Sequence, residues 1–279
     1  MRGGIKNILI MKEKLVHVAF ILDSSGSMYG SKEDVVGGFN KTIDEQRAIE
    51  DGECIVSLYT FNDDVKRVFL GKSLDEIKPL TTKTKPIVSC SFCNTLSAQA
   101  WIDNNGNYIT SLINTHDEFS NKDEYAYSPD GCTAMNDGIG IAIDEIGKWL
   151  ADMPEGERPS KNLIVIMTDG MENASKEYSL VKVREMIKHQ TEVYNWSFVY
   201  MGTDITTTDA AEGLGINMRS YSSRATSDTY QNYTNISVAT SAYRCGSAAT
   251  FKDVEAELCE NLRNMTASYE ATTGVKIEN

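Results

Sequence analysis

Three short segments of the chain combine carboxylates and hydroxyls in a pattern suited to binding a cation. The first is Asp23-Ser24-Ser25-Gly26-Ser27, which directly follows a run of apolar residues. Carboxylate and hydroxyl oxygens are hard ligands that suit Mg²⁺, Mn²⁺ or Ca²⁺ better than zinc. Gly26 allows the chain to turn back, so that Ser25 and Ser27 face the same point as Asp23. The segment predicts a divalent-cation site, although Ser-rich turns of this kind also cap helices.

Thr133 and Asp169 are the candidate ligands in the other two segments. Thr133 opens a predicted helix, and we expect its hydroxyl to be exposed. Asp169 follows a second run of apolar residues. The nearby Glu172 is interpreted as a solvated loop residue, and the alternative is that it orients the site through a hydrogen bond. Ligands of parallel sheets bind beyond the carboxyl ends of the strands. We therefore expect Asp169 to lie near Asp23, at that edge of the sheet.

Apolar runs alternate with helical patterns along the chain, which indicates an α/β fold with a mainly parallel sheet. Runs that are apolar throughout are typical of strands buried on both faces. The turn at residues 62–64 separates two strand patterns and predicts a hairpin, with an antiparallel strand at the edge. The predicted strands are 16–22, 54–61, 65–70, 163–167 and 196–201, and the predicted helices are 32–50, 133–150, 179–189, 208–214 and 251–269.

Residues 84–127 do not fit this alternation. The turn Asn104-Asn105-Gly106 lies between short apolar pairs, and Asn-Gly is a strong hairpin signal. We interpret 84–127 as a β-rich insertion beside the candidate site. It belongs to a single domain that spans 11–279 and ends in a C-terminal helical segment, 245–279. The Ser-, Thr- and Tyr-rich residues 221–243 are interpreted as a surface segment that contains a helix.

The charge of the chain argues against two classes of partner. Lys and Arg number 27 and Asp and Glu number 40, so the formal net charge is −13. A surface this negative repels phosphate backbones and anionic lipids, so we expect neither nucleic acid nor a membrane as partner. Runs of about 20 apolar residues, as a membrane span requires, are missing from the sequence.

The cysteines and the N-terminus suggest a cytoplasmic protein. The apolar stretch near the N-terminus is too short for a secretory signal, and Met11 is an alternative start. The 6 Cys are therefore interpreted as reduced thiols. Cys90 and Cys93 form a CxxC pair, but a zinc ribbon needs a second pair, so we interpret them as ordinary thiols.

Together the three segments resemble the von Willebrand factor A (vWA) domain family, whose metal-ion-dependent adhesion site (MIDAS) combines D-x-S-x-S, a distant Thr and a distant Asp. The matching positions are Asp23, Ser25, Ser27, Thr133 and Asp169. The resemblance covers about residues 16–215 apart from the insertion, and it is closest to stand-alone bacterial and phage-encoded members. It implies a Rossmann-like, doubly wound sheet with helices on both faces and a bound Mg²⁺, or else Mn²⁺ or Ca²⁺.

The resemblance also implies a binding protein rather than an enzyme. In the family, the metal keeps an open coordination position, which an acidic residue of a partner protein fills. One alternative is a scaffold with a merely structural metal, which recognises its partner through Trp101, Tyr108 and Phe119 of the insertion. Another is a metal-dependent phosphohydrolase, which needs a base or a phosphate-binding Arg near the ion. His17 lies inside the first predicted strand, so we expect it in the core rather than in the role of a base.

Overall fold

The computed structural model describes residues 12–50, 52–82, 101–102, 108–109, 125–202 and 206–216, together with 237, 240, 241 and 244. The strands are β1 (Lys12–Asp23), β2 (Glu53–Phe61), β3 (Val65–Ser73), β4 (Trp101–Ile102), β5 (Tyr108–Ile109), β6 (Pro159–Thr168) and β7 (Ser197–Gly202). The helices are α1 (Lys32–Arg47), α2 (Met135–Asp152), α3 (Leu180–Tyr194) and α4 (Thr206–Leu214), with 3₁₀ turns η1 (Gly26–Ser31), η2 (Leu74–Glu76) and η4 (Glu155–Glu157).

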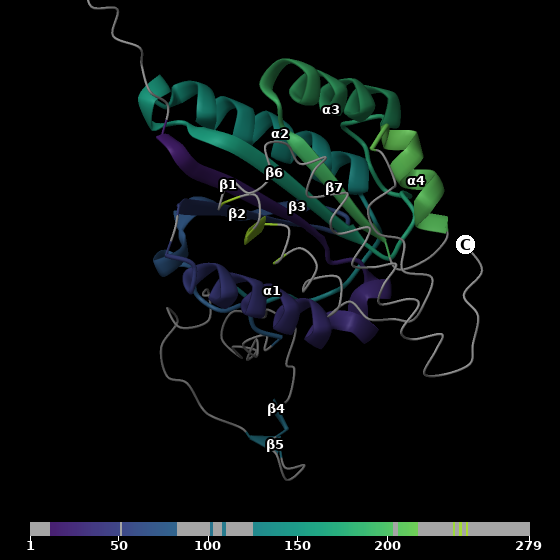
Figure 1. The fold of residues 1–279 in the computed structure, drawn as a ribbon. Helices are drawn as coiled ribbons and strands as arrows, with labels where there is room; N and C mark the ends of the chain where they lie inside the picture. The colour runs from purple at the N-terminus through teal and green to yellow at the C-terminus, as the bar shows by residue number, and fades with distance from the viewer. Residues whose placement is uncertain are drawn as a thin grey trace, which may run out of the picture.

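Five of the strands form one sheet in the order β3-β2-β1-β6-β7. β1 pairs in parallel with β2 and β6, and β6 pairs in parallel with β7, whereas the edge strand β3 runs antiparallel to β2. Helix α1 covers one face of the sheet, and α2, α3 and α4 cover the other (Figure 1). The predicted fold class, a mainly parallel doubly wound sheet with one antiparallel edge strand, is confirmed.

The central strand β1 is buried on both faces because successive side chains point to opposite sides of the sheet. Phe20 packs with Phe39 of α1, their ring centroids 5.2 Å apart. Ile21 belongs to the core on the other face, together with Ile139 of α2. The uninterrupted apolar pattern therefore reflects two separate cores, and it brings Asp23 to the end of the strand between them.

The predicted insertion is described only in part. β4 and β5 pair antiparallel, with Trp101 opposite Ile109, as expected for a hairpin around residues 104–106. The other residues from 84 to 124 lie outside the described residues, and so do the CxxC cysteines Cys90 and Cys93. The limits of the insertion and of the domain therefore stay predictions.

The last residues assigned to the insertion belong to the main core. Thr81 N donates to Tyr125 O at 3.0 Å, and Tyr127 N donates to Thr81 O at 2.8 Å. The side chains of Tyr125 and Tyr127 are buried in the core on the α1 face. The two ends of the segment 82–124 are thus held side by side.

The described residues 237, 240 and 241 are helical, as expected for a helix-bearing segment at 221–243, but the prediction that this segment lies at the surface is corrected. Ser237, Thr240 and Arg244 are buried. The Gln46 amide donates to Ser237 O at 3.1 Å, and the Arg244 guanidinium donates to Gln46 O at 2.6 Å. The last carbonyls of a helix have no partner within it, so these contacts complete the end of α1. The predicted helix 251–269 lies outside the described residues.

His17 is a buried polar residue of β1, as expected for a core histidine. Its Nδ1 lies 3.1 Å from Asn162 Oδ1, and its Nε2 lies 2.8 Å from Ser57 Oγ. Its ring packs edge-to-face against Trp149, with 5.2 Å between the centroids. Burial lowers the pKa of His17 to about 4, because the surroundings disfavour the charged imidazolium.

Acid should destabilise the protein through His17. In the unfolded chain the imidazole takes up its proton near its ordinary pKa of 6.5. The contribution of neutral His17 to stability is therefore fully present above pH 6.5 and is lost as the pH falls towards 4. The largest slope from one group is about 1.4 kcal/mol per pH unit. Urea unfolding at a series of pH values measures this loss.

The variant His17→Gln isolates this effect because glutamine does not titrate. As the pH falls from neutral to about 4.5, the free energy of unfolding should decrease by about 2 kcal/mol less in the variant than in the unmodified protein. Above the ordinary pKa of histidine, the difference between the two proteins should be constant. Parallel stability profiles across the acidic range would contradict the prediction.

Candidate metal centre

The oxygen-bearing side chains that the sequence singles out lie together at the carboxyl edge of the sheet: Asp23, Ser25, Ser27, Thr133 and Asp169. Ser25 Oγ lies 3.1 Å from Ser27 Oγ, and Ser27 Oγ donates to Asp169 Oδ1 at 2.6 Å. A Cβ atom placed on Gly170 would lie 3.0 Å from Thr133 Oγ1, 3.5 Å from Ser27 Oγ and 3.6 Å from Asp23 Oδ2. Oxygens from three separate segments therefore surround one small volume beside Gly170.

The first segment is shaped by hydrogen bonds to the loops on either side of it. Asp23 Oδ1 accepts from Ser25 N at 2.7 Å, which turns the chain directly after β1. Ser24 N donates to Phe61 O at 2.7 Å, at the end of β2. Gly26 N donates to Gly131 O at 3.0 Å, on the segment that leads to Thr133. The end of β1 is thus attached both to its neighbour strand and to the segment that carries Thr133.

Gly131 allows a close approach at this point. Its φ is +75°, a left-handed conformation that favours glycine, and a Cβ there would lie 1.9 Å from Asp63 Oδ2. The same Asp63 oxygen accepts from Cys132 N at 3.1 Å. The turn after β2 therefore also supports the segment before Thr133.

Thr133 is buried, which corrects the expectation of an exposed hydroxyl. Only 4% of the residue is exposed, and helix α2 begins two residues later, at Met135. Thr133 N donates to the Asn173 side chain at 2.9 Å, and Asn173 N donates to Thr133 O at 3.0 Å. This reciprocal pair joins the segment of Thr133 to the segment that follows Asp169. Sequence reasoning did not single out Asn173, because its partner is 40 residues away.

The loop after Asp169 is also fixed to the start of α2. The Glu172 carboxylate accepts from Asn136 N at 2.8 Å, from Ala174 N at 3.0 Å and from Ser175 N at 2.8 Å. Asp137 accepts three backbone amides of residues 176–178. Glu172 is therefore a hydrogen-bonded anchor at a helix N-terminus, where a negative charge is favourable, and its interpretation as a solvated loop residue is wrong.

Two residues outside the predicted set orient Asp23. Thr168 Oγ1 donates to Asp23 Oδ2 at 2.5 Å and accepts from Gly170 N at 3.1 Å. The Tyr127 hydroxyl donates to the backbone carbonyl of Asp23. A buried hydroxyl at the end of an apolar strand is a sequence signal for Thr168, whereas Tyr127 lies 104 residues from Asp23.

The two carboxylates of the cluster carry uncompensated negative charge. Asp23 is fully buried, and burial raises the pKa of its carboxyl group. The nearby negative charge of Asp169 also raises this pKa, whereas the hydrogen bonds from Thr168 and Ser25 lower it. Among the residues that the structure describes, neither carboxylate forms an ion pair with Lys or Arg. Buried carboxylates in proteins are usually paired or coordinate a metal, so the cluster fits a cation.

The chemistry of these donors selects the kind of cation. Two carboxylates and three hydroxyls are hard oxygen donors, which fit Mg²⁺, Mn²⁺ or Ca²⁺. Within the described part of the chain, His, Cys, Asp and Glu do not gather in groups of three or more that could hold a metal. The cluster thus depends on its hydroxyls, unlike a zinc site of Cys and His. That these residues bind a metal stays a prediction.

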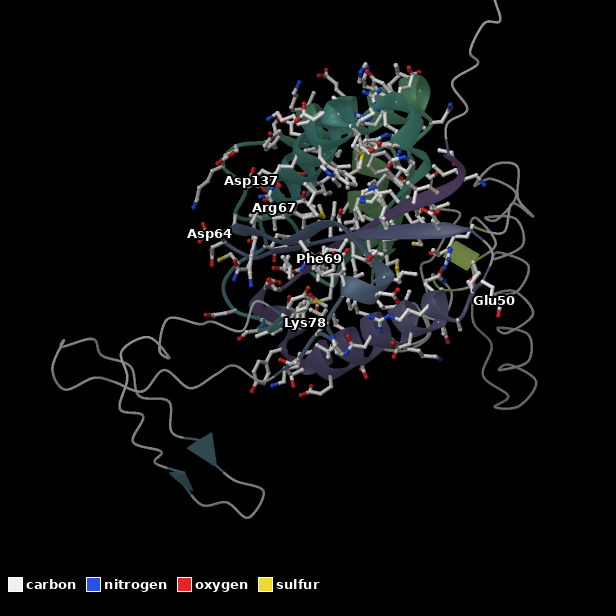
Figure 2. All side chains as sticks on the ribbon, turned by 90° about the vertical axis from the view of Figure 1, so that its left-hand side faces the viewer. Glu50, Asp64, Arg67, Phe69, Lys78 and Asp137 are labelled. Atoms are coloured by element: carbon white, nitrogen blue, oxygen red, sulfur yellow. The ribbon has the colours of Figure 1, made fainter. Side chains whose placement is uncertain are left out.

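The cluster lies at the carboxyl edge of the sheet, and two labelled residues mark this edge in Figure 2. Figure 2 shows Asp64, in the turn between β2 and β3, and Asp137, in the first turn of α2, at one end of the molecule. Glu50, beyond the end of α1, lies at the opposite end (Figure 2). Parallel strands end, and their following helices begin, at the edge marked by Asp64 and Asp137.

In the described ranges, no helix is both long enough and apolar enough to cross a membrane.

Solved structures offer distant likenesses. Proximal thread matrix protein 1 from the mussel byssus matches with 14% identity and a TM-score of 0.48, over 90% of this chain and 47% of that one. A von Willebrand factor type A protein from Catenulispora acidiphila matches with 11% identity and a TM-score of 0.43, over 82% of this chain and 43% of that one. The manganese-loaded TRAP protein of Plasmodium vivax matches with 17% identity and a TM-score of 0.44, over 81% and 72%.

These comparisons do not show the function of this chain, so only its own geometry bears on that function. The chain spans about half the length of the mussel protein, 47%. At such identities and TM-scores, the likenesses carry no argument about ligands or partners. No family model matches the sequence, and a search of curated proteins found no match. The α/β fold is established by the strand order of the chain itself, and its carboxyl edge carries the oxygen cluster.

Proposed function

We propose that this chain is a member of the vWA family and a non-enzymatic binding protein that uses a divalent cation. In this proposal, Mg²⁺, or else Mn²⁺ or Ca²⁺, is held in a MIDAS by Asp23, Ser25, Ser27, Thr133 and Asp169. An open position on the ion then accepts an acidic residue of a partner protein. A cytoplasmic location and a bacterial or phage origin stay predictions from the sequence.

The observation that supports the proposal is the convergence of oxygens beside Gly170. Thr133 Oγ1, Ser27 Oγ and Asp23 Oδ2 all lie within 3.6 Å of a Cβ placed on this glycine. They come from two segments that are far apart in sequence, and hydrogen bonds join these segments to each other and to the segment of Asp169. Such a cluster of negative charge and lone pairs, whose carboxylates form no ion pair among the described residues, suits a cation.

The ligand set explains why the ion would attract an acidic partner. The hydroxyls of Ser25, Ser27 and Thr133 are neutral, so they leave a divalent cation with residual positive charge. When bound, the ion supplies a Lewis-acidic site for a carboxylate oxygen. The chain itself orients the ligands: Thr168 holds the Asp23 carboxylate, and Asn173 holds the backbone of Thr133.

The phosphohydrolase alternative is less well supported than binding. His17 lies six residues before Asp23 on β1, so the rise of a strand places it about 20 Å away. Both of its ring nitrogens have hydrogen-bond partners, Asn162 and Ser57. His17 therefore does not serve as a base at the candidate site. Incubation with generic phosphoesters and Mg²⁺ tests this alternative directly.

Substitution of two ligands tests the metal site. Asp23→Ala and Thr133→Ala should each weaken Mg²⁺ binding, measured by titration calorimetry, by about 100-fold or more. Removal of groups that only support a ligand already costs about 10- to 100-fold, so loss of the ligand itself should cost at least the upper value. The matched control is Asp64→Asn, which removes a charge from the same edge (Figure 2) but lies outside the oxygen cluster.

Circular dichroism will show that the variants are folded, so that a loss of binding is not a loss of structure. Unchanged Mg²⁺ affinity in both ligand variants would contradict the proposed site. An equal loss in Asp64→Asn would show that overall charge, rather than the cluster, attracts the ion.

A second prediction concerns Thr168, which touches Asp23 but is not a proposed ligand. Thr168→Val keeps the shape of the side chain but removes the donor to Asp23 Oδ2 and the acceptor for Gly170 N. We expect a loss of about 1–3 kcal/mol in stability and about tenfold or more in Mg²⁺ affinity. Thr168→Ser keeps the hydroxyl and should restore most of the affinity. Equal affinities for the two variants would be evidence against a role of Thr168 in orienting Asp23.

Partner capture separates the MIDAS from the insertion. A partner held through the ion should be lost on addition of EDTA and with Asp23→Ala, yet retained when residues 86–124 are deleted. The pairing of Thr81 with residues 125–127 keeps the ends of the deleted segment together. The chain has a formal net charge of −13, so it repels an acidic partner as a whole. Added salt screens this repulsion, so binding of an acidic partner should strengthen as the salt concentration rises. Capture that survives EDTA but is lost on deletion favours the scaffold alternative.

A further inference from the structure

Two large apolar side chains are exposed beside the candidate metal centre. Tyr29 of η1 is 63% exposed and Met171 is 65% exposed. Tyr29 follows Ser27 by two residues, and Met171 follows Asp169 by two residues. Ser27 Oγ and Asp169 Oδ1 are 2.6 Å apart, and two residues of chain span at most about 7 Å. The backbones of Tyr29 and Met171 therefore lie within about 7 Å of the backbones of Ser27 and Asp169, respectively. We name these two exposed side chains the apolar rim.

A basic side chain accompanies the apolar rim. Lys32 Nζ lies 4.2 Å from the centroid of the Tyr29 ring, which is a cation–π contact. The same ammonium lies 3.8 Å from Glu33 Oε1, so part of its charge is balanced. The contact with Lys32 limits the motion of the Tyr29 ring, and the ammonium adds positive potential where an acidic group would approach an ion.

The apolar rim stands out from the other exposed apolar side chains of the described part. These belong to α3, at its first residues and in its last turn: Leu180, Val181, Val193 and Tyr194. Single exposed apolar residues are normal on a protein surface. Tyr29 and Met171 differ because each belongs to a segment that carries a proposed ligand, two residues before it in the chain.

Resting on the proposed function, we infer that the apolar rim selects the partner. A carboxylate bound to the ion would bring the neighbouring residues of the partner within reach of Tyr29 and Met171. If the residues beside the partner's carboxylate are polar, they place polar groups against the apolar side chains of Tyr29 and Met171. If those residues are apolar, they cover the two side chains and remove them from water, which is favourable. The fitting partner is a chain segment in which large apolar side chains flank the acidic residue, and Lys32 favours its approach.

Labelled peptides test this inference on the full chain with Mg²⁺ present. One peptide carries a central Asp between Leu and Phe, a second carries the same Asp between Ser residues, and a third carries Asn between Leu and Phe. Fluorescence anisotropy should show the first to bind about tenfold or more tightly than the second, because covering the exposed part of a large apolar side chain gives at least this factor. The third should not bind, because it lacks the carboxylate.

Variants of the apolar rim provide the second part of the test. Tyr29→Ser and Met171→Ser should each lower the affinity for the apolar-flanked peptide by about fivefold to tenfold and leave the Mg²⁺ affinity unchanged. The control is Val193→Ser, which also replaces an exposed apolar side chain, in the last turn of α3. That turn precedes β7, so it lies at the edge of the sheet opposite to the cluster. Val193→Ser should leave both affinities unchanged.

The outcomes separate this inference from the proposed function. Three results overturn the inference alone, provided that Mg²⁺ still binds. The two Asp peptides bind with equal affinity, neither of them binds, or the rim variants have no effect on peptide binding. Absence of Mg²⁺ binding overturns the proposed function, and the inference with it. A Mg²⁺-dependent dimer in sedimentation, lost in Tyr29→Ser, would mean that a second copy covers the rim, which also overturns the inference.

Discussion

The burial of the Asp23 carboxylate at the end of the central strand is the constraint on which the site depends. β1 lies between β2 and β6, so its last residue is surrounded by the ends of two other strands. A carboxylate in this place needs donors, and Thr168 at the end of β6 and the backbone of Ser25 supply them. Neither donor carries a positive charge, and Asp169 adds a second negative one. The fold thus leaves a local excess of negative charge that a cation can balance.

Hydrogen bonds join the segments around this carboxylate. Gly26 bonds to Gly131, Thr133 bonds to Asn173, and Glu172 accepts from Asn136 N of α2 and from an amide of its own loop. All of these bonds except the last link segments that are distant in sequence. A site with ligands held in this way loses little conformational freedom on binding, so more of the interaction with the ion appears as affinity. Hydrogen bonds between loops therefore contribute to the site alongside the proposed ligands themselves.

The two parts of the chain outside the regular α/β alternation also contact the elements of the site. The segment that follows the insertion passes Asp23, where the Tyr127 hydroxyl bonds to the backbone carbonyl. The C-terminal part contacts α1, the helix that follows η1 and the first ligand segment, through Gln46 and Arg244. The Arg244 guanidinium donates to the carbonyl of Gln46 at the end of α1, which water would otherwise solvate. These hydrogen bonds join segments whose contact no hydrophobic pattern in the sequence predicts.

The sequence alone determined the fold class and the five candidate ligands, because both depend on local order. Buried parallel strands are apolar throughout, and hard-ligand segments such as Asp23 to Ser27 are contiguous. Helix ends were less predictable: α2 begins at Met135 rather than Thr133, and α1 ends before residue 50. Only the tertiary structure decided that Thr133 is buried, that Glu172 is an anchor and that Thr168, Asn173 and Tyr127 orient the ligands. Those roles depend on hydrogen bonds between segments far apart in the chain, whose pairing follows from the packing of the sheet and helices and leaves no periodic pattern in the sequence.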